Sequence, residues 1–373
     1  MDFALSDEHL MLRESAQDFL SAEVDLGPLL LPGATVSAAK RDALWAKMVE
    51  LGWTALVIPE DDGGYGMSHV DLMMIIEQVG RSLAPCSLFG TLAGTWAILA
   101  AGSPPQREAL LPGVASGERR LALAVADRRG RVGPLDMVAR QAGTGWRLEG
   151  HSALVLDAGE ADQIVVAAKL DGVSRLFLVD RNASGLAVDL LEWRDITRAV
   201  YRLEASDTAA ELMPGDFTVV WPWIRDRLYL LLAAESLGGL AQVVEATVDY
   251  AKERVAFGRP IGAYQAIKHQ LADMKGDLEC ASAAVLYAAW ALDADPEAAS
   301  LAAAMAQAFT GEAYANAAFR SIQIFGAIGF TWEMRNHLYF KRARANAELL
   351  GSPAQQRAEI SDVLHARQQM ANV

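Results

Sequence analysis

Hydrophobic and polar positions divide the chain into three stretches with different periods. From Leu5 to about Ser116, apolar residues return every three or four positions, which predicts amphipathic helices, with Ser6 as the cap of the first. From about Arg120 to Leu212, short runs rich in Val, Leu and Ile are divided by Gly, Asp and Asn, which predicts strands. Helical periodicity returns from about Trp223 to the end.

The order helix, strand, helix predicts an α+β multi-domain fold. We expect an N-terminal helical domain at residues 1–117, a central β domain at 118–215 and a C-terminal helical bundle at 216–373, with Pro214 and Gly215 at the second boundary. A chain of 373 residues is long enough for several such domains.

Gly63, Gly64 and Gly66 interrupt the first helical stretch. Closely spaced glycines occur in phosphate-binding loops, but here no strand precedes them and no Gly-Lys-Ser/Thr sequence follows. A tight turn is therefore the favoured interpretation.

Composition narrows the class of protein. The formal net charge of −14 argues against nucleic acid as a partner, because that binding needs basic patches. No apolar run approaches the ~18–20 uncharged residues of a membrane-spanning helix. The N-terminus is acidic and lacks the basic-then-apolar layout of an export signal, so we expect a soluble, cytoplasmic protein with no membrane partner.

Cysteines and histidines indicate neither a disulfide nor a metal site. Cys86 and Cys280 lie far apart in the sequence, and both are expected to be small buried hydrophobes. The six histidines share no metal-binding spacing, so no metal is expected.

The most informative stretch is residues 250–274, YAKERVAFGRPIGAYQAIKHQLADM. It predicts a helix that ends at Arg254, a break at Gly258 and Pro260, and a new helix from about Tyr264. An arginine, an aromatic ring and an amide thus gather near one break, which suits a pyrophosphate with an adenine or ribose. A kinked helix junction with a surface arginine explains the same residues, and the physical pattern alone leaves both interpretations open.

Two motifs resemble those of the acyl-CoA dehydrogenase family. The stretch above is similar to the family's R-x-x-FG-x-x-I-x-x-x-Q signature, and QIFGAIGF at residues 323–330 is similar to Q-x-x-GG-x-G-[FY], with Ala327 replacing the second glycine. The helix, β, helix order also agrees, so the resemblance covers nearly the whole chain. It implies an N-terminal helical domain, a central β-barrel-like domain and a C-terminal four-helix bundle.

In this family a tetramer forms and FAD lies across a subunit interface. The resemblance therefore implies that this chain holds the ADP end of a flavin whose ring sits in a neighbouring chain. The implied cofactor-binding residues are Arg254, Phe257, Gln265, Gln323 and Gly326.

The family's catalytic carboxylate is missing from this sequence. The family's reaction removes a proton from Cα of an acyl-CoA thioester, which needs an aligned carboxylate in a dry pocket. Counted forward from Gln323 without gaps, one family position for this base is Leu350, and counted back from Arg254 the other is Leu228. A leucine cannot accept a proton, so no catalytic residue is assigned to this chain.

The resemblance also weakens in the β domain. Members that hold a flavin ring carry a T-E-x-x-x-GSD-like loop and a W-I-[TS] strand. Here the loop at residues 124–133 reads AVADRRGRVG and the strand at 154–156 reads LVL. The motifs that contact the flavin ring and the catalytic carboxylate are thus both missing, while the residues implied for the ADP end of FAD remain.

The chain thus resembles the base-lacking subunit of α2β2 heterotetrameric acyl-CoA dehydrogenases, notably bacterial ones that act on steroid-derived CoA esters. We expect a homologous catalytic subunit as partner, FAD shared across the subunit interface, an acyl-CoA as substrate and electron-transfer flavoprotein as electron acceptor.

Two other functions stay open. An autonomous homotetrameric dehydrogenase would need a displaced base, and Asp226, Glu235 and Glu348 lie near the two leucine positions, although ordinary helix-end and surface roles explain them equally well. A non-catalytic assembly scaffold would use the fold alone, but would have no need of the ADP-end residues. Nothing in the sequence specifically supports a flavin oxidase or monooxygenase.

Overall fold

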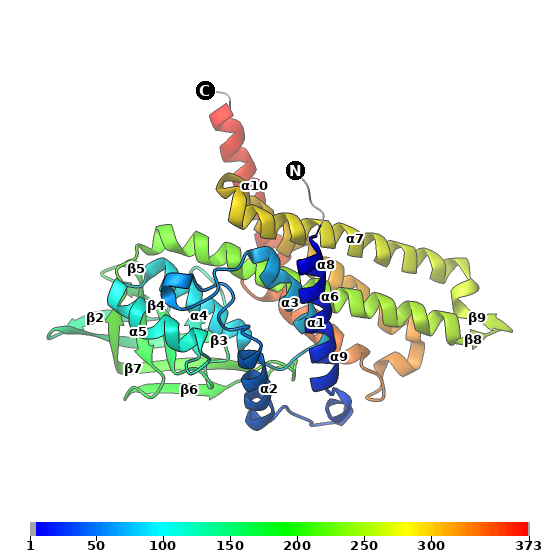
Figure 1. The fold of residues 1–373 in the computed structure, drawn as a ribbon, viewed down its shortest axis with the longest axis horizontal. Helices are drawn as coiled ribbons and strands as arrows, with labels where there is room; N and C mark the ends of the chain where they lie inside the picture. The colour runs from blue at the N-terminus through cyan, green and yellow to red at the C-terminus, as the bar shows by residue number, and fades with distance from the viewer. Residues whose placement is uncertain (1–4, 372–373) are drawn as a thin grey trace.

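The chain folds into helical, β and helical regions in the predicted order. A computed structural model describes residues 5–371. Figure 1 shows strands β2 to β7 gathered at one end of the molecule, and the long helices α6 and α7 running to the opposite end, where the short strands β8 and β9 lie. The predicted α+β architecture is therefore confirmed.

The N-terminal region consists of helices that begin at well-formed caps. Ser6 accepts a hydrogen bond from the backbone N–H of His9, as the sequence predicted, and α2, α3 and α5 also begin after serines that accept from the third helical N–H. The elements are α1 (Asp7–Glu23), η1 (Gly27–Leu30), α2 (Ala38–Glu50), η2 (Glu60–Asp62), α3 (His69–Ser82), α4 (Leu88–Ala101) and α5 (Pro104–Ala115).

The central strands form a mixed sheet that closes into a barrel. β4 pairs with β2 along one edge and with β5 along the other, and the pairs β5–β7, β7–β3 and β3–β2 complete the ring. β1 lies parallel beside β4, and β6 pairs with β7. The β-barrel-like prediction is confirmed. The strands are β1 (Leu121–Ala124), β2 (Val138–Ala142), β3 (Gly145–Leu156), β4 (Gln163–Leu170), β5 (Val173–Asp180), β6 (Leu186–Leu190) and β7 (Val200–Leu212).

The C-terminal region is a bundle of α6, α7, α8 and α9, from which α10 extends outward (Figure 1). Among the described residues, α6 is long and apolar enough to cross a membrane, but 89% of its most apolar stretch is buried inside the fold, as expected for a core helix. The elements are α6 (Phe217–Glu253), β8 (Val255–Ala256), β9 (Arg259–Pro260), η3 (Ile261–Ala263), α7 (Gln265–Ala294), α8 (Pro296–Phe325), η4 (Gly326–Phe330), α9 (Asn336–Glu348) and α10 (Pro353–Ala371).

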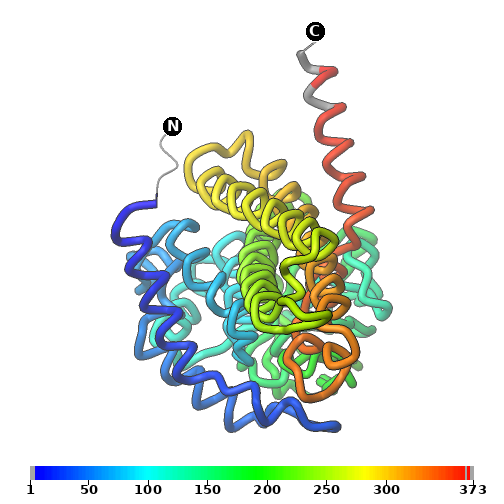
Figure 2. The backbone as a smooth tube through the Cα atoms, turned by 90° about the vertical axis from the view of Figure 1, so that its right-hand side faces the viewer, coloured from blue at the N-terminus to red at the C-terminus, as the bar shows by residue number. Residues whose placement is uncertain are grey.

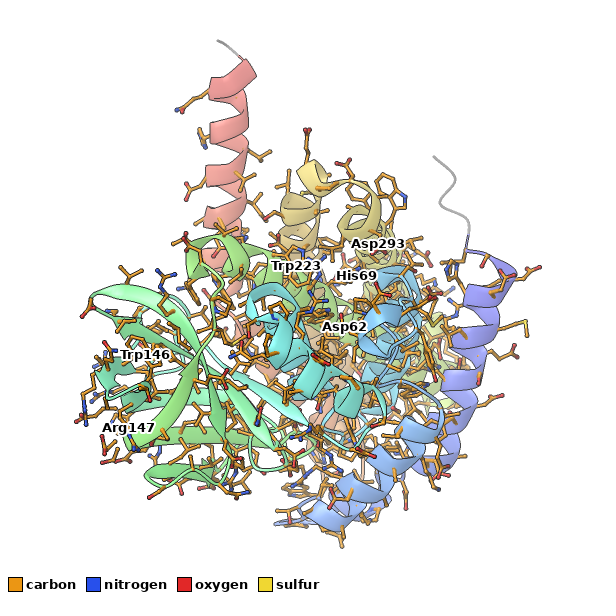
Figure 3. The ribbon with its side chains drawn as sticks, turned by 60° about the vertical axis from the view of Figure 1, so that its left-hand side comes forward. Asp62, His69, Trp146, Arg147, Trp223 and Asp293 are labelled. Atoms are coloured by element: carbon orange, nitrogen blue, oxygen red, sulfur yellow. The ribbon has the colours of Figure 1, made fainter. Side chains whose placement is uncertain are left out.

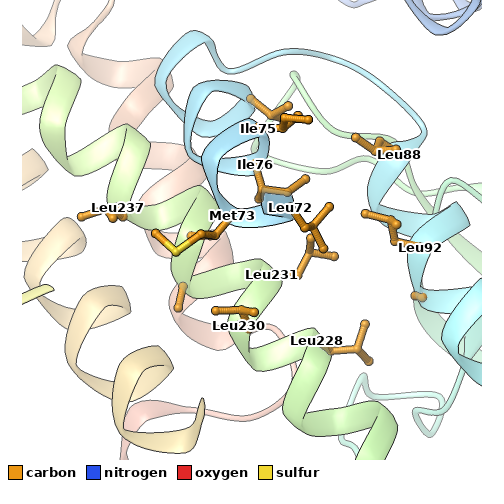
Figure 4. Close-up of a cluster of buried hydrophobic side chains, with 14 of the residues drawn as sticks. Leu72, Met73, Ile75, Ile76, Leu88, Leu92, Leu228, Leu230, Leu231 and Leu237 are labelled. Carbon is orange, nitrogen blue, oxygen red and sulfur yellow. The ribbon is translucent and has the colours of Figure 1, made fainter. Parts of the chain in front are cut away.

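Apolar side chains join the N-terminal helices to α6. Figure 4 shows Leu72 of α3, Leu92 of α4 and Leu228 of α6 in one buried cluster. This packing fixes the position of Leu228 between two regions of the fold.

A polar contact ties α3 to α7 at another place. The backbone N–H of His69 donates to a carboxylate oxygen of Asp293 at 2.8 Å, and the imidazole Nδ1 of His69 contacts the other oxygen. Figure 3 shows the two side chains next to each other. The N-terminal region is thus attached to the bundle near the end of α7.

Some smaller sequence predictions have mixed outcomes. The prediction that both cysteines are buried is wrong for Cys280, which is exposed because it lies beside Gly276 and Glu279 on the outer face of α7, whereas Cys86 is partly buried. The exact domain boundaries stay predictions, although α5 ends shortly before residue 117 and α6 begins shortly after residue 215.

Candidate functional site

A tight hairpin connects α6 to α7. Arg254 caps the end of α6, and the two residues between β8 and β9 are Phe257 and Gly258, with φ of 52° and 80°. Positive φ at both central residues is typical of a type I′ turn, which favours Asn-Gly rather than Phe-Gly. The predicted helix end, break and restart are confirmed, and the new helix α7 begins at Gln265.

Phe257 stands out within this hairpin. Its side chain is 98% exposed, and its backbone occupies the left-handed region that bulky residues rarely adopt. Strain and exposure together make this residue a functional candidate, because strained positions persist at sites where they serve a purpose.

An aromatic stack brings the end of α8 to the same place. The rings of Tyr250 and Phe325 lie parallel with centroids 3.9 Å apart, so the last turns of α6 and α8 are side by side. Gln323 therefore lies at the same end of the bundle as Arg254. Figure 2, viewed from that end, shows the junction near residues 254–265 and the segment from residue 326 onward facing the viewer.

Gly326 ends α8 in a conformation that only glycine adopts readily, with φ of 70° and ψ of −143°. A Cβ built on Gly326 would meet no atom within 4 Å, so the backbone borders open space. The structure thus gathers the predicted residues at one exposed end, which we call the nucleotide surface. Its members are Arg254, Phe257, Gln265, Gln323 and Gly326.

An apolar chamber lies at the other end of α6, between α4, β1, β3 and the turn that follows α9. Leu228 and Leu350, which are 122 positions apart in the sequence, both line it. Among the described residues that line the chamber, none has an ionisable side chain. The two family positions for the base thus meet in one cavity, and both are apolar.

The walls of the chamber are strained. Leu154 in β3 has φ of 56° and Leu350 has φ of 63°, although neither is glycine. Such conformations are uncommon for non-glycine residues and collect at active sites and ligand clamps. The strained backbone makes the chamber a candidate for a functional site, and its described lining side chains are not ionisable.

The loop at residues 124–133 uses its backbone donors internally. The carboxylate of Asp127 accepts hydrogen bonds from the N–H groups of Arg129 and Arg131, at 2.8 and 2.9 Å. The guanidinium of Arg131 donates to the same carboxylate at 2.8 Å. These two backbone N–H groups are consequently not free to hydrogen-bond a ligand placed in the chamber.

A polar cleft of about 950 Å³ adjoins the chamber and shares Leu154 and Leu350 with it. Charged side chains of both signs line this cleft. They are Arg129, Arg131, Arg225, Glu348 and Glu359. Glu348 is exposed and lies 3.5 Å from Arg344, so it belongs to the cleft and not to the chamber.

Protein-family models match most of the chain. Residues 6–118 match the model described as acyl-CoA dehydrogenase, N-terminal domain, and residues 227–365 match acyl-CoA dehydrogenase, C-terminal domain. A curated relative, acyl-CoA dehydrogenase IpdE2 of Mycobacterium tuberculosis, is 33% identical over 93% of this chain and 94% of its own length. The chain belongs to the acyl-CoA dehydrogenase family.

Two solved structures share this fold, and the first is named a steroid ACAD. A variant of the Tcur3481–Tcur3483 steroid ACAD has a TM-score of 0.87 and 29% identity, covering 97% of this chain and 99% of that one. The ChsE4–ChsE5 complex from Mycobacterium tuberculosis has a TM-score of 0.87 and 26% identity, covering 98% and 99%. The resemblance to steroid-type acyl-CoA dehydrogenases is thereby confirmed.

The other acidic residues near α6 are poor candidates for the acyl-CoA dehydrogenase base. Glu235 is buried between Arg198 and Arg342; burial raises its pKa, but the two guanidinium groups outweigh burial and hold the pKa below the ordinary value. Asp226 contacts Arg225 at 3.0 Å, and burial raises its pKa. Neither carboxylate lines the chamber.

Sequence reasoning expected the five residues of the nucleotide surface to bind the cofactor, which stays a prediction, and it missed three features of this acyl-CoA dehydrogenase chain. These are the stack of Tyr250 on Phe325, the strain at Leu154, and the use of loop donors by Asp127. The acidic residue followed by Arg-Arg-Gly-Arg at 127–131 was a signal for a self-bonded turn, since aspartate commonly bonds the backbone two residues on. The stack and the strain had no local signal.

Proposed function

We propose that this chain is the base-lacking subunit of a heteromeric acyl-CoA dehydrogenase, and that its nucleotide surface completes the FAD site of a catalytic partner subunit. The observation that carries the proposal is the apolar chamber, in which Leu228 and Leu350 occupy both family positions for the base. The partner supplies the carboxylate that takes the Cα proton of an acyl-CoA. FAD, when bound, accepts the hydride from Cβ.

The nucleotide surface fits the ADP end of FAD. The guanidinium of Arg254 suits phosphate oxygens, and the first turn of α7 has no side-chain cap, so its N–H groups and helix dipole favour an anion beside Gln265. Phe257 offers an exposed ring for stacking, and the open backbone at Gly326 permits close approach.

The chamber of this chain does not fit a flavin ring. A flavin presents several ring nitrogens and oxygens, which need donors when buried, and the chamber walls are apolar. In the loop at residues 124–133, the backbone N–H groups of Arg129 and Arg131 already donate to the carboxylate of Asp127. These features support a ring that lies in the partner and not in this chain.

The relatives support the heteromeric assembly and suggest the substrate class. The Tcur3481–Tcur3483 and ChsE4–ChsE5 proteins are each named as a pair of unlike chains, and the first is named a steroid ACAD. We propose a steroid-derived acyl-CoA as substrate, electron-transfer flavoprotein as acceptor and the cytoplasm as the location.

Separate and joint expression tests this function. The chain purified alone is expected to carry no tightly bound flavin that an acyl-CoA reduces, whereas the chain co-purified with a homologous subunit that has the catalytic glutamate is expected to carry one FAD for each pair of unlike chains. The measurements are the flavin absorbance per protein and its bleaching by acyl-CoA. Substrate-reducible flavin in the chain alone would refute the proposal.

An autonomous dehydrogenase is the second candidate, because Glu348 lines the polar cleft next to the chamber. If Glu348 were a displaced base, Glu348→Gln would lower turnover of the isolated chain by about two to four orders of magnitude. Our account predicts no turnover by the isolated chain, and no effect of Glu348→Gln on turnover by the complex.

A further inference from the structure

A second polar pocket, of about 570 Å³, lies between α1, α3, α6 and the start of α9. It shares no lining residue with the chamber, the cleft or the nucleotide surface. We call it the arginine pocket, because Arg81 of α3 and Arg335 at the cap of α9 both line it.

Among the described residues, Arg335 supplies the unpaired positive charge of the arginine pocket, because Glu245 pairs with both terminal nitrogens of Arg81. Among the described residues that line it there are two arginines and no carboxylate. Glu245, which does not line the pocket, accepts a hydrogen bond from one guanidinium nitrogen of Arg81 at 3.1 Å and pairs with a second. The side chain of Arg335 makes no hydrogen bond or ion pair with the described part of the chain, so its donors are available to an anion.

A buried amide in the wall independently indicates a missing polar partner. Gln78 of α3 is 2% exposed and lines the pocket, and its carboxamide oxygen has no hydrogen-bond partner among the described residues. A buried amide is normally satisfied, because leaving it unpaired destabilises the folded state. Such a group persists where a bound molecule completes its hydrogen bonds.

The remaining polar groups suit a ligand with hydroxyl or carbonyl groups. Gln17 and Ser21 of α1 and Gln242 of α6 line the same pocket, while leucine and valine side chains of α1 close one side. These groups donate and accept hydrogen bonds without charge.

We propose that the arginine pocket binds a small polar organic anion that carries a carboxylate or a phosphate. Arg335 and Arg81 hold the charged group, and the carboxamide of Gln78 hydrogen-bonds a hydroxyl or carboxyl proton of the ligand. The site is separate from flavin and acyl binding. Because it joins α1 to the start of α9, an occupied pocket stabilises the contact between the N-terminal region and the bundle.

Titration with citrate and with inorganic phosphate tests the proposal and shows whether the pocket prefers a carboxylate or a phosphate. Calorimetry and thermal unfolding are measured on the isolated chain and on the complex with its partner subunit. At least one of the two anions is expected to bind saturably and raise the melting temperature. Arg335→Gln is expected to weaken that binding about tenfold or more, because it removes a charge-assisted hydrogen bond.

A substitution of Gln78 in the pocket wall shows whether its side chain binds a ligand or has only a structural role. Gln78→Met keeps the volume and removes the unpaired amide, so it is expected to raise the melting temperature without ligand and to abolish the additional rise with ligand. Arg357→Gln removes an equal charge from the exposed surface of α10 and serves as the control, with unchanged anion affinity.

Three results would overturn the proposal. They are the absence of saturable binding by both anions, unchanged affinity in Arg335→Gln, and loss of anion binding on assembly with the partner, which would assign the pocket to a protein side chain. The proposed function is tested separately, by the flavin content of the complex. Arg335→Gln is expected to leave that flavin content unchanged.

Discussion

Phe257 combines two features that are unfavourable in an isolated chain. Its ring is almost fully exposed, and its φ of 52° places a bulky residue in the left-handed region. Neither feature contributes to the stability of this chain, so both are explained by a contact made in the assembly. A substitution of Phe257 should therefore have different effects on folding stability and on function.

Replacing Phe257 with asparagine tests this separation. Asn-Gly is the preferred sequence for a type I′ turn, so Phe257→Asn is expected to stabilise the isolated chain by about 1 kcal/mol while it weakens FAD binding by the complex. Chemical denaturation and flavin content measure the two effects. Lower stability together with full flavin content would contradict this role for Phe257.

Asp157 is a buried carboxyl group at the end of β3. Burial raises its pKa to about 7, against the hydrogen bond that the N–H of Gly90 donates to it at 2.9 Å. The folded state therefore binds a proton that the unfolded state releases above about pH 4. It follows that the contribution of Asp157 to stability is greatest below about pH 4, declines as the pH rises towards 7 and is level above that value.

Asp157→Asn is expected to flatten this dependence. The asparagine oxygen still accepts from Gly90, and the variant should gain on the order of 2 to 4 kcal/mol of stability at pH 8, with little gain near pH 4. Urea midpoints at pH 4, 6 and 8 measure the profile. Asp171→Asn, at an exposed turn position whose φ of 50° asparagine tolerates, is the control. Parallel profiles for wild type and Asp157→Asn would exclude this titration.

At the scale of elements, a buried ionic network positions α9. Arg342 donates to Glu235 of α6 and to Thr197 in the loop before β7, each at 2.6 Å, and it pairs with Asp195. The turn after α9 carries Leu350 into the chamber. The network therefore fixes the chamber as well as the helix.

Arg342→Met is expected to destabilise the chain by about 3 to 5 kcal/mol, because Asp195 stays buried without its ion-pair partner and Glu235 keeps only Arg198. Arg344→Met, two residues along α9, removes an exposed pair with Glu348 and should change stability by less than about 1 kcal/mol. Thermal unfolding of the two variants measures the difference. Similar melting temperatures would show that the network contributes little.

Local signals in the sequence predicted some elements well. Gly258 and Pro260 predicted the break between α6 and α7, because glycine permits positive φ and proline ends a helix. The start of α6 was predicted too late, near Trp223. Asp216 caps the helix at Phe217, and Pro222 lies inside the helix, at its sixth residue.

Tertiary features of the site had no local signal. The meeting of Leu228 and Leu350 in one chamber depends on how α6, β3 and the turn after α9 pack. Counting along the family motifs predicted these positions by resemblance, and the fold explains why both counts lead to one cavity. The closed barrel was likewise expected only from the resemblance, since strand patterns do not specify how β4 pairs on both edges.

At the scale of the whole molecule, the two ends of α6 have different roles. One end lines an apolar chamber without a base, and the other ends in an exposed surface that suits a nucleotide. Exposed apolar side chains near that surface, including Val255, Phe319 and Phe330, favour burial against another chain. Under the proposed function, a chain with this division depends on a partner for the chemistry and contributes binding surface in return.

The most direct test of this account is the flavin content of the complex formed with a catalytic partner subunit, when Arg254 is replaced. Arg254→Ala is expected to leave assembly intact and to weaken FAD binding about 10- to 100-fold, because a charge-assisted contact to phosphate is lost. Lys252→Ala, which removes an equal exposed charge two residues earlier, should retain full flavin. A complex of Arg254→Ala with unchanged FAD affinity would contradict the central claim.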